Sequence, residues 1–174
     1  MFFFKEISCQ DYEKINNEIY LWISSQPLLM NSKNFWNPVS VIELLQSTPL
    51  FLSWLKNVNL EIKNVAVTIA RDTHACGAHT DTPPARYKLS WPVLNCQGSF
   101  NRWFKIIDDP IAEVNHLGGT SYHDYNTLEE IDRREVIAPA LIDAGIPHDV
   151  WFSKNARYPR IGLQCQLLKE PSEL

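Results

Sequence analysis

The chain has 174 residues, of which 45% are hydrophobic and 21% charged, and its formal net charge is -4. This length suits one domain with a single hydrophobic core, and this composition is typical of a globular protein rather than a disordered or fibrous one. The 16 Lys and Arg residues are scattered among 20 Asp and Glu residues. Because no basic stripe is present to bind a phosphate backbone, nucleic acid is not an expected partner.

No segment predicts export or membrane insertion. The apolar start, Met1 to Phe4, is followed at once by Lys5 and Glu6, so it is far too short for a secretory signal or a membrane span. We therefore expect a cytoplasmic protein without a membrane partner. The cysteines lie far apart and form no CxxC pair, which predicts reduced thiols rather than a zinc knuckle or a disulfide framework. They are Cys9, Cys76, Cys96 and Cys165.

The first third of the chain, residues 1–58, is predicted to be helical. Ser8 to Asp11 resembles a capping box, and apolar residues at helical spacing follow it, which predicts an amphipathic helix over 9–25. Asn37-Pro38 combines a capping side chain with a proline suited to the first helical position, and Thr48-Pro49 repeats this combination. We expect a second and a third helix to begin there and to support the rest of the chain.

From residue 59 the sequence changes to short runs rich in β-branched and aromatic residues, which are typical of strands. The predicted strands are 60–70, 86–95, 99–107, 135–143, 148–152 and 160–168. Helices that lead into many strands without βαβ alternation predict a single α+β, mainly β domain over 1–174, with a rolled or sandwiched antiparallel sheet over 59–168. Residues 108–134 are polar and contain Gly and Pro, which predicts a long insertion or lid between strands.

A candidate metal site begins at His79 and Asp81, which are one residue apart in a predicted loop. Residues i and i+2 of an extended or turning backbone project to the same side, so an imidazole and a carboxylate can converge on one ion. His148 follows a predicted strand and is the candidate third ligand. Two histidines and one carboxylate on one face of an ion leave the opposite positions open, as in non-haem iron oxygenases. The alternative is an Asp81 that only caps the following Thr-Pro turn.

A candidate anion-binding residue lies further along the chain. Arg160 begins the last predicted strand, after His148, and a guanidinium binds a carboxylate in bidentate geometry. Arg157 lies nearer to His148 and takes this role if the last loop is shorter than expected. Strand alternation also places Lys88 and Ser90 on one polar face, which either looks into the barrel or is the solvated face of an edge strand.

Together these motifs resemble the 2-oxoglutarate/iron(II)-dependent oxygenases, whose fold is a double-stranded β-helix. The resemblance rests on His79-Thr80-Asp81, on Gly145 to Val150 and on Pro159 to Leu163, and it covers about residues 60–168. These segments look most like the aspartyl/asparaginyl β-hydroxylase branch. The resemblance implies a jelly-roll, cupin-like core with N-terminal supporting helices. It also implies hydroxylation of an amino-acid or peptide side chain or a small molecule.

The resemblance assigns roles to individual residues. It implies that His79, Asp81 and His148 hold Fe(II), and that Arg160 anchors the cosubstrate 2-oxoglutarate, with Lys88 and Ser90 in secondary contact. Many family members carry Ser or Thr two residues after the anchoring Arg, and here this position is Gly162. Other groups must therefore complete the cosubstrate site. The Asp of the first motif, which the resembled branch usually lacks, argues against a halogenase.

Several aromatic and imidazole side chains remain without an assigned role. Trp103 either walls the pocket or, as is more usual for an aromatic residue in a strand, packs in the core. His74, His116 and His123 have no partner at an interpretable spacing, although the last two flank Gly118-Gly119 in the predicted lid and are candidates for a substrate contact.

Two other functions remain possible for the same residues. A non-catalytic β-helix or cupin-like module would bind a ligand and leave 2-oxoglutarate unconsumed. A zinc hydrolase would use the same three ligands to activate water. No HExxH motif or other assigned base accompanies them in the sequence, which ranks this alternative lower.

Overall fold

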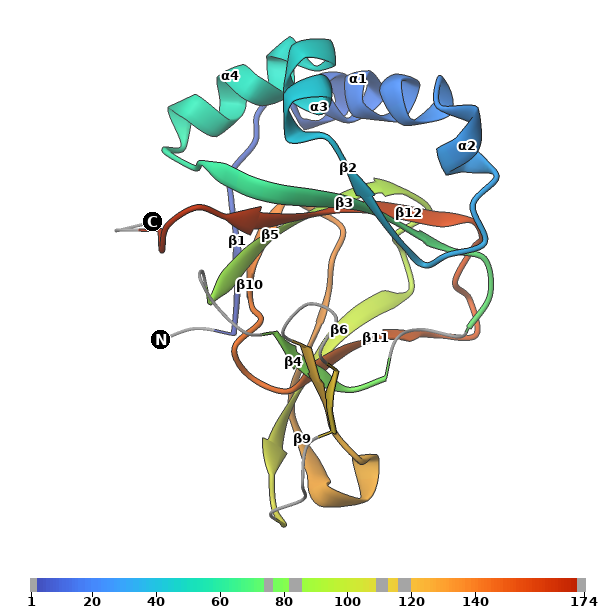
Figure 1. Ribbon diagram of the computed structural model, residues 1–174, viewed down its shortest axis with the longest axis vertical. Coiled ribbons are helices and arrows are strands. Elements are labelled where there is room, and N and C mark those ends of the chain that lie inside the picture. The colour runs from blue at the N-terminus through green and yellow to red at the C-terminus, as the bar shows by residue number, and fades with distance from the viewer. Residues whose placement is uncertain (1–2, 74–76, 82–85, 109–112, 116–119, 172–174) are drawn as a thin grey trace.

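The structure is a computed structural model that describes residues 3–73, 77–81, 86–108, 113–115 and 120–171. It contains helices and two antiparallel sheets, which lie in three successive layers (Figure 1). The helices are α1 (Tyr12–Ser24), α2 (Pro27–Met30), α3 (Val41–Ser47) and α4 (Pro49–Asn57), with a 3-10 helix η1 (Tyr125–Thr127). The prediction of a mainly β chain with N-terminal helices and antiparallel sheets is confirmed at this level.

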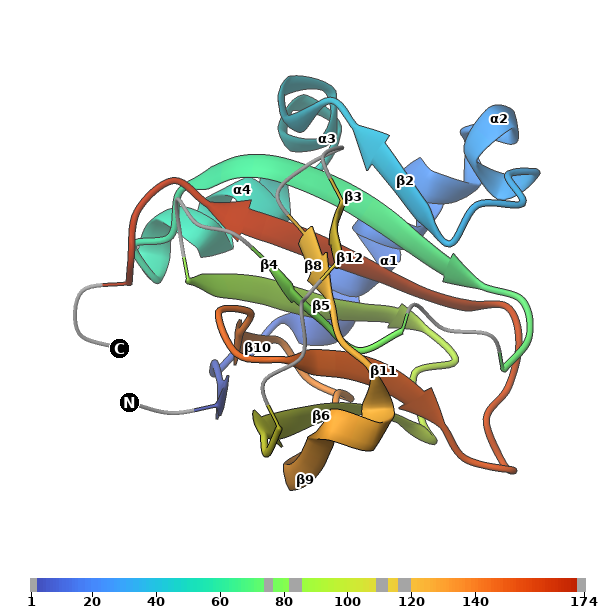
Figure 2. The same ribbon diagram turned by 60° about the horizontal axis from the view of Figure 1, so that its bottom comes forward.

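Each sheet has six strands. The first sheet has the spatial order β1 (Phe4–Glu6), β10 (Ala140–Asp143), β5 (Tyr87–Leu94), β12 (Arg160–Leu167), β3 (Ile62–Ala70) and β2 (Trp36–Val39). The second has the order β7 (Glu113–Asn115), β8 (Thr120–Tyr122), β4 (His79–Asp81), β11 (His148–Phe152), β6 (Ser99–Ile106) and β9 (Leu128–Glu135). Figure 2 shows β3, β12 and β5 side by side in the first sheet.

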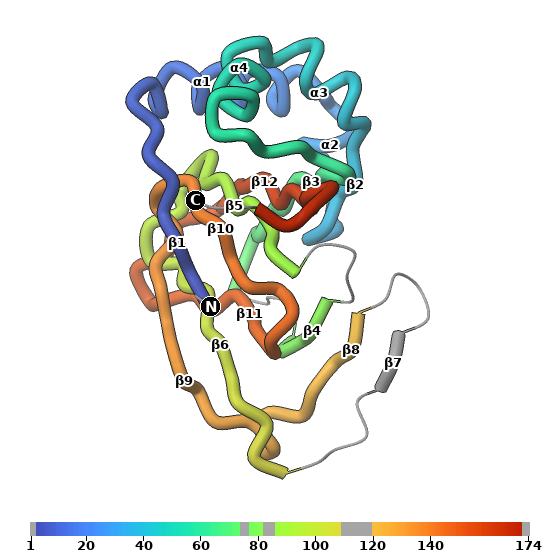
Figure 3. The backbone as a smooth tube through the Cα atoms, turned by 90° about the vertical axis from the view of Figure 1, so that its left-hand side faces the viewer, coloured from blue at the N-terminus to red at the C-terminus, as the bar shows by residue number. Residues whose placement is uncertain are grey.

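Eight of these strands pair in a nested order. The antiparallel pairs are β3 with β12, β4 with β11, β5 with β10, and β6 with β9. Strands from the first half of the chain therefore meet strands from the second half in reverse order. This pairing places His79 directly opposite His148, although 68 residues separate them in the sequence. The tube in Figure 3 shows β4 and β11 close together on the side of the molecule away from the helices.

The helices cover the outer face of the first sheet. The apolar face of α1 is buried as its spacing predicts, and it includes Ile19 and Ile23. Opposite it, Trp91 of β5 is fully buried, and its ring packs against Phe51 and Trp54 of α4 with centroid distances of 5.1 and 5.0 Å. Burial of these large apolar side chains is the main favourable term in attaching the helices to the sheet. None of the helices in the described ranges is both long and apolar enough to cross a membrane.

Two predicted helix starts need correction. Helix α1 begins at Tyr12 rather than near residue 9, because Ser8 does not cap it and the preceding Ile7 donates its backbone N–H to the Pro139 carbonyl. Asn37-Pro38 lies in β2, and helix α3 begins only after Ser40, whose hydroxyl accepts the Glu43 N–H. Pro38 is tolerated because β2 is at the edge of its sheet. Pro49 is the first residue of α4, as Thr48-Pro49 predicts, but the Thr48 side chain does not cap this helix, because its hydroxyl donates to the Leu44 carbonyl.

The predicted strands also need correction in two places. The run 135–143 is two strands, because β9 ends at Glu135 and β10 begins at Ala140 in the other sheet. The prediction that 108–134 is an insertion is wrong over β9, which pairs with β6 along its length. Strand β9 has the sequence LEEIDRRE and lies at the edge of the second sheet. Because both of its faces are polar, it shows none of the apolar alternation that predicts a strand.

Candidate metal centre

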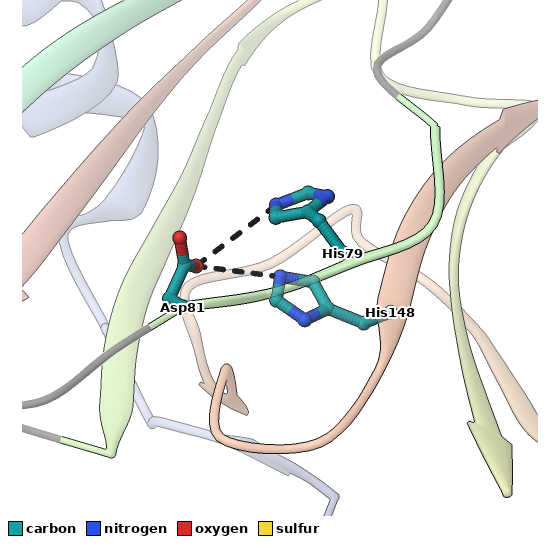
Figure 4. A group of neighbouring side chains, drawn as sticks. All are labelled: His79, Asp81 and His148. Carbon is teal, nitrogen blue, oxygen red and sulfur yellow. Dashed lines mark ion pairs between the residues drawn. The ribbon is translucent and has the colours of Figure 1, made fainter. Parts of the chain in front are cut away.

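Three side chains converge between β4 and β11 (Figure 4). His79 and Asp81 are the first and last residues of β4, which the sequence predicted as a loop, and His148 is the first residue of β11. The Asp81 Oδ2 atom lies 3.6 Å from His148 Nε2 and 4.0 Å from His79 Nε2. The potential ligand atoms of all three residues lie within 4.8 Å of one another. The structure therefore brings the three predicted ligands together.

Hydrogen bonds to backbone carbonyls determine which nitrogen carries the proton in each imidazole. His79 Nδ1 lies 2.9 Å from the Gly77 carbonyl oxygen, and His148 Nδ1 lies 2.9 Å from the Ile146 carbonyl oxygen. A carbonyl oxygen can only accept, so both Nδ1 atoms carry the proton and both Nε2 atoms present a lone pair. The two Nε2 atoms face Asp81. Such hydrogen bonds from the far side of the ring orient histidines that bind metals.

Electrostatics favours the protonation states that a metal site needs. Burial, together with the neighbouring His79, lowers the pKa of His148 to about 3, so this imidazole is neutral at physiological pH. Burial alone raises the pKa of Asp81, but the Lys88 ammonium opposes this effect through its charge and its hydrogen bond, and the pKa lies below its ordinary value. The cluster thus combines a carboxylate with at least one neutral imidazole, His148, which suits a divalent transition metal.

Lys88 lies beside the three ligands. Its ammonium donates a hydrogen bond to Asp81 Oδ2 and lies 5.3 Å from the centre of the Trp36 ring. The predicted polar face of β5 therefore does look inward. Ser90, on the same face, is buried and accepts a hydrogen bond of 2.8 Å from Gln164 Nε2. The structure thus places Ser90 behind Gln164, whereas Lys88 contacts the candidate ligand Asp81 directly.

The turn that delivers His148 is held by a buried carboxylate that the sequence analysis did not identify. Asp143 has no exposed side-chain surface, and it accepts hydrogen bonds from the Arg86 guanidinium and from the Gly145 N–H. The backbone of residue 144 adds a link to the metal cluster, because its carbonyl accepts the Asp81 N–H at 2.9 Å. Trp103 donates its indole N–H to the Asp143 carbonyl and is fully buried. Trp103 therefore belongs to the core and not to a pocket wall.

A cavity of about 860 Å³ lies between the two sheets and includes all three candidate ligands in its lining. Arg160 also lines it, with only 1% of its surface exposed. Its Nη1 donates to the Thr68 hydroxyl at 3.1 Å, and its buried Nε has no hydrogen-bond partner in the described part of the protein. A buried donor without a partner is unfavourable unless a ligand completes it. Arg157, the alternative anchor, is exposed and is not part of the cavity lining.

Gly162 makes room for the contact between Arg160 and Thr68. Thr68 lies directly opposite Gly162 on the neighbouring strand β3, and its hydroxyl donates to the Gly162 carbonyl. A Cβ atom at position 162 would lie 3.3 Å from Thr68 Oγ1 and 3.4 Å from Arg160 Nη1. The hydroxyl beside Arg160 thus comes from Thr68 on the next strand, and not from position 162. No sequence motif predicts this, because the pairing of β3 with β12 decides it.

The other histidines are not among the candidate metal ligands. His123 Nε2 lies 2.7 Å from the Thr80 hydroxyl, between the two candidate ligands of β4, and His123 Nδ1 is buried without a partner among the described residues. Burial and His79 lower the pKa of His123. His123 therefore supports β4 from its outer side. His74 and His116 lie outside the described residues.

Comparison with known proteins does not assign the chain to a family. No family model matches the chain, and no curated protein matches it. One matching solved structure is titled "X-Ray structure of E. coli ycfD", with a TM-score of 0.40 and 14% sequence identity over 72% of this chain and 30% of that one. The present chain thus spans less than a third of that protein, and a likeness at this level carries no argument about activity.

Proposed function

We propose that the protein is a non-haem Fe(II)/2-oxoglutarate-dependent dioxygenase that hydroxylates an amino-acid or peptide side chain or a small molecule. The observation that carries this proposal is one cavity with two different sites. The cavity holds two imidazoles and a carboxylate on one side, and a buried guanidinium with an unpartnered Nε on the other. The first set fits an iron that keeps open positions, and the second fits the distal carboxylate of 2-oxoglutarate.

The strand pairing supports a double-stranded β-helix as the scaffold. In such a jelly roll, an antiparallel double strand is wound into two facing sheets, so early and late strands of the chain pair in nested order. The pairs β3–β12, β4–β11, β5–β10 and β6–β9 have this order and alternate between the two sheets. The scaffold would be a single domain of the β-hydroxylase type, with α1 to α4 as its support.

The residues would divide the work as follows. His79, Asp81 and His148 would hold the iron through Nε2, a carboxylate oxygen and Nε2. Arg160, steadied by Thr68, would bind the distal carboxylate of 2-oxoglutarate, and Lys88 would add positive charge beside it. Bound iron with 2-oxoglutarate supplies the oxidising chemistry, in which oxygen is consumed and succinate released.

The remaining alternatives differ in what they leave unexplained. A non-catalytic binding module would use the same cavity, but it gives no reason for three metal donors with the lone pairs of both imidazoles facing one carboxylate. A zinc hydrolase would use those donors, but it gives no reason for a guanidinium buried in the same cavity. The free thiols of Cys9, Cys96 and Cys165 suit the reducing cytoplasm, where we place the enzyme.

The decisive experiment uses protein purified without oxygen. We expect one equivalent of Fe(II) to bind, 2-oxoglutarate to produce a visible metal-to-ligand charge-transfer band, and oxygen to release succinate. A band without succinate in the presence of oxygen would favour the binding module. Zinc that binds stoichiometrically and excludes iron, with no band, would favour the hydrolase.

Arg160 and Arg157 form a matched pair for the cosubstrate. Loss of the charged partner of a buried carboxylate costs about 2–5 kcal/mol, so Arg160→Ala should weaken 2-oxoglutarate binding roughly 30- to 4,000-fold and leave iron binding intact. Arg160→Lys should recover only part of this loss, because an ammonium keeps the positive charge but lacks the planar fork of the guanidinium. The exposed Arg157→Ala is the control and should bind normally. Normal binding by both alanine variants, measured by titration of the charge-transfer band, contradicts the assignment.

A further inference from the structure

The charges that line the cavity are unbalanced. Lys63, Lys88 and Arg160 line it, whereas Asp81 is the one acidic side chain among the described lining residues. A divalent metal and the dianion 2-oxoglutarate would cancel each other's charge, so bound cofactors leave this positive excess unchanged. A cavity with such a field attracts anions and repels cations.

Lys63 is well separated from Arg160, the proposed anchor of the cosubstrate. Strand register places Arg160 opposite Ala70 and Gln166 opposite Asn64, next to Lys63. Six residues of strand correspond to roughly 20 Å, at about 3.3 Å per residue. Lys63 is therefore too far from Arg160 to share the same carboxylate, and it is available to a second ligand. Its ammonium forms no hydrogen bond or ion pair with the described residues, and its side chain is exposed at the mouth of the cavity.

The mouth combines polar and apolar walls. Asn64 Nδ2 donates to Gln166 Oε1 at 2.7 Å, which leaves the Gln166 amide N–H groups free to donate to an anion beside Lys63. The other wall is apolar, because Trp36 is 45% exposed and Ile42 is 69% exposed, and both line the cavity. One ammonium and one amide match a single negative charge better than a phosphate dianion.

From this arrangement we infer that the substrate carries a carboxylate, bound by Lys63 and Gln166, together with an apolar portion that packs on Trp36 and Ile42. The same charges disfavour a substrate with a cationic group in this position. The inference depends on the proposed function only in calling the ligand a substrate. The charge preference of the mouth itself is a property of the cavity, with or without cofactors.

The test compares 4-phenylbutyrate with 4-phenylbutylamine, which share an apolar body and carry opposite charges. Calorimetric titration of anaerobic protein loaded with Fe(II) and 2-oxoglutarate should give about tenfold tighter binding of the acid, because attraction by Lys63 becomes repulsion for the amine. Lys63→Met should remove the preference, and Lys63→Arg should keep it. Lys56→Met, which changes an exposed lysine of α4, is the control and should behave like the wild type. Trp36→Ala should weaken both ligands alike.

The outcomes separate this inference from the proposed function. Iron and 2-oxoglutarate binding are measured first, and the same ligand pair is titrated into metal-free protein. If the protein binds both cofactors but the acid shows no advantage, or does not bind at millimolar concentration, the inference is overturned and the proposed function stands. If the cofactors do not bind but the preference depends on Lys63 in metal-free protein, the proposed function fails and the anion subsite stands. A preference that survives Lys63→Met overturns the assignment to Lys63.

Discussion

His79, Asp81 and His148 are equivalent in one respect, since each provides one of only three protein donors to the proposed iron. The backbone carbonyls of Gly77 and Ile146 fix the tautomers of the two imidazoles, so the protein has already ordered the donor atoms before the metal arrives. Lys88 donates to Asp81 Oδ2, so it would share this carboxylate with a bound cation.

We expect Ala at any of these three positions to abolish stoichiometric Fe(II) binding, because two donors do not hold the ion against water. Calorimetric titration of Fe(II) under anaerobic conditions measures this. His123→Ala is the control, since His123 contacts Thr80 rather than the cluster, and it should retain one equivalent. Unchanged Fe(II) affinity in all three ligand variants would contradict the proposed metal centre.

Thr68 tests how Arg160 is positioned. Thr68→Val keeps the side-chain shape but removes the acceptor of the Arg160 Nη1 hydrogen bond. A hydrogen bond to a charged group contributes about 1.5–3 kcal/mol, so we expect 2-oxoglutarate to bind roughly tenfold or more weakly, with Fe(II) affinity unchanged. Thr68→Ser keeps the hydroxyl and should bind normally. If Thr68→Val and Thr68→Ser bind alike, the hydroxyl does not position Arg160.

Strands β10 and β11 and the turn between them form the element that carries His148. Asp143 closes β10, accepts hydrogen bonds from Arg86 at the start of β5, and accepts the Gly145 N–H of the turn. Its carboxylate thus joins three segments that the metal site depends on. Asp143 is fully buried in this ion pair whereas Arg86 is partly exposed, so the carboxylate depends on the guanidinium for compensation of its charge.

Asp143→Asn should therefore loosen the turn before it affects the rest of the fold. We expect iron affinity to fall by about 10- to 100-fold, as for other groups that orient a metal ligand. Hydrogen exchange provides an independent measurement, because the Asn carboxamide is a weaker acceptor than the carboxylate, so the Gly145 amide should exchange faster. Weaker iron binding with unchanged exchange at Gly145 would show that Asp143 acts in some other way.

At the level of the complete chain, ligand binding and folding are coupled. His79 and His148 come from strands that meet only in the folded protein, so the unfolded chain offers no preformed site. A ligand that binds only the native state stabilises it by about 2.7 kcal/mol at 100 times its Kd. This corresponds to roughly 5–10 °C in the melting temperature of a chain of this size.

We therefore expect the melting temperature of anaerobic protein to rise when Fe(II) and 2-oxoglutarate are added together, and to fall back when a chelator removes the metal. Differential scanning calorimetry measures both steps. Asp81→Ala should show neither change. A rise that persists in Asp81→Ala would place the binding somewhere other than the proposed centre.

The sequence by itself determined the class of the fold and the identity of the clustered residues. Its helical periodicity located α1, and its β-branched runs located β3, β5, β6, β11 and β12 to within a few residues. These signals are local, because alternation or helical spacing in one segment reports which face that segment buries. The three metal-ligand candidates could also be identified from the sequence, because His and Asp are recognisable as metal ligands by residue type alone.

Only the tertiary structure decided the remaining features. Strand β9 carries no apolar alternation and becomes a strand only because β6 offers it a partner edge. Ser40, not Asn37, caps α3, because β3 pairs with β2 and draws Asn37 into the sheet. The Thr68 hydroxyl reaches Arg160 because the register of β3 against β12 places it opposite Gly162. Each of these outcomes depends on pairing between distant segments, and the free energy of such pairing is not encoded in either segment alone.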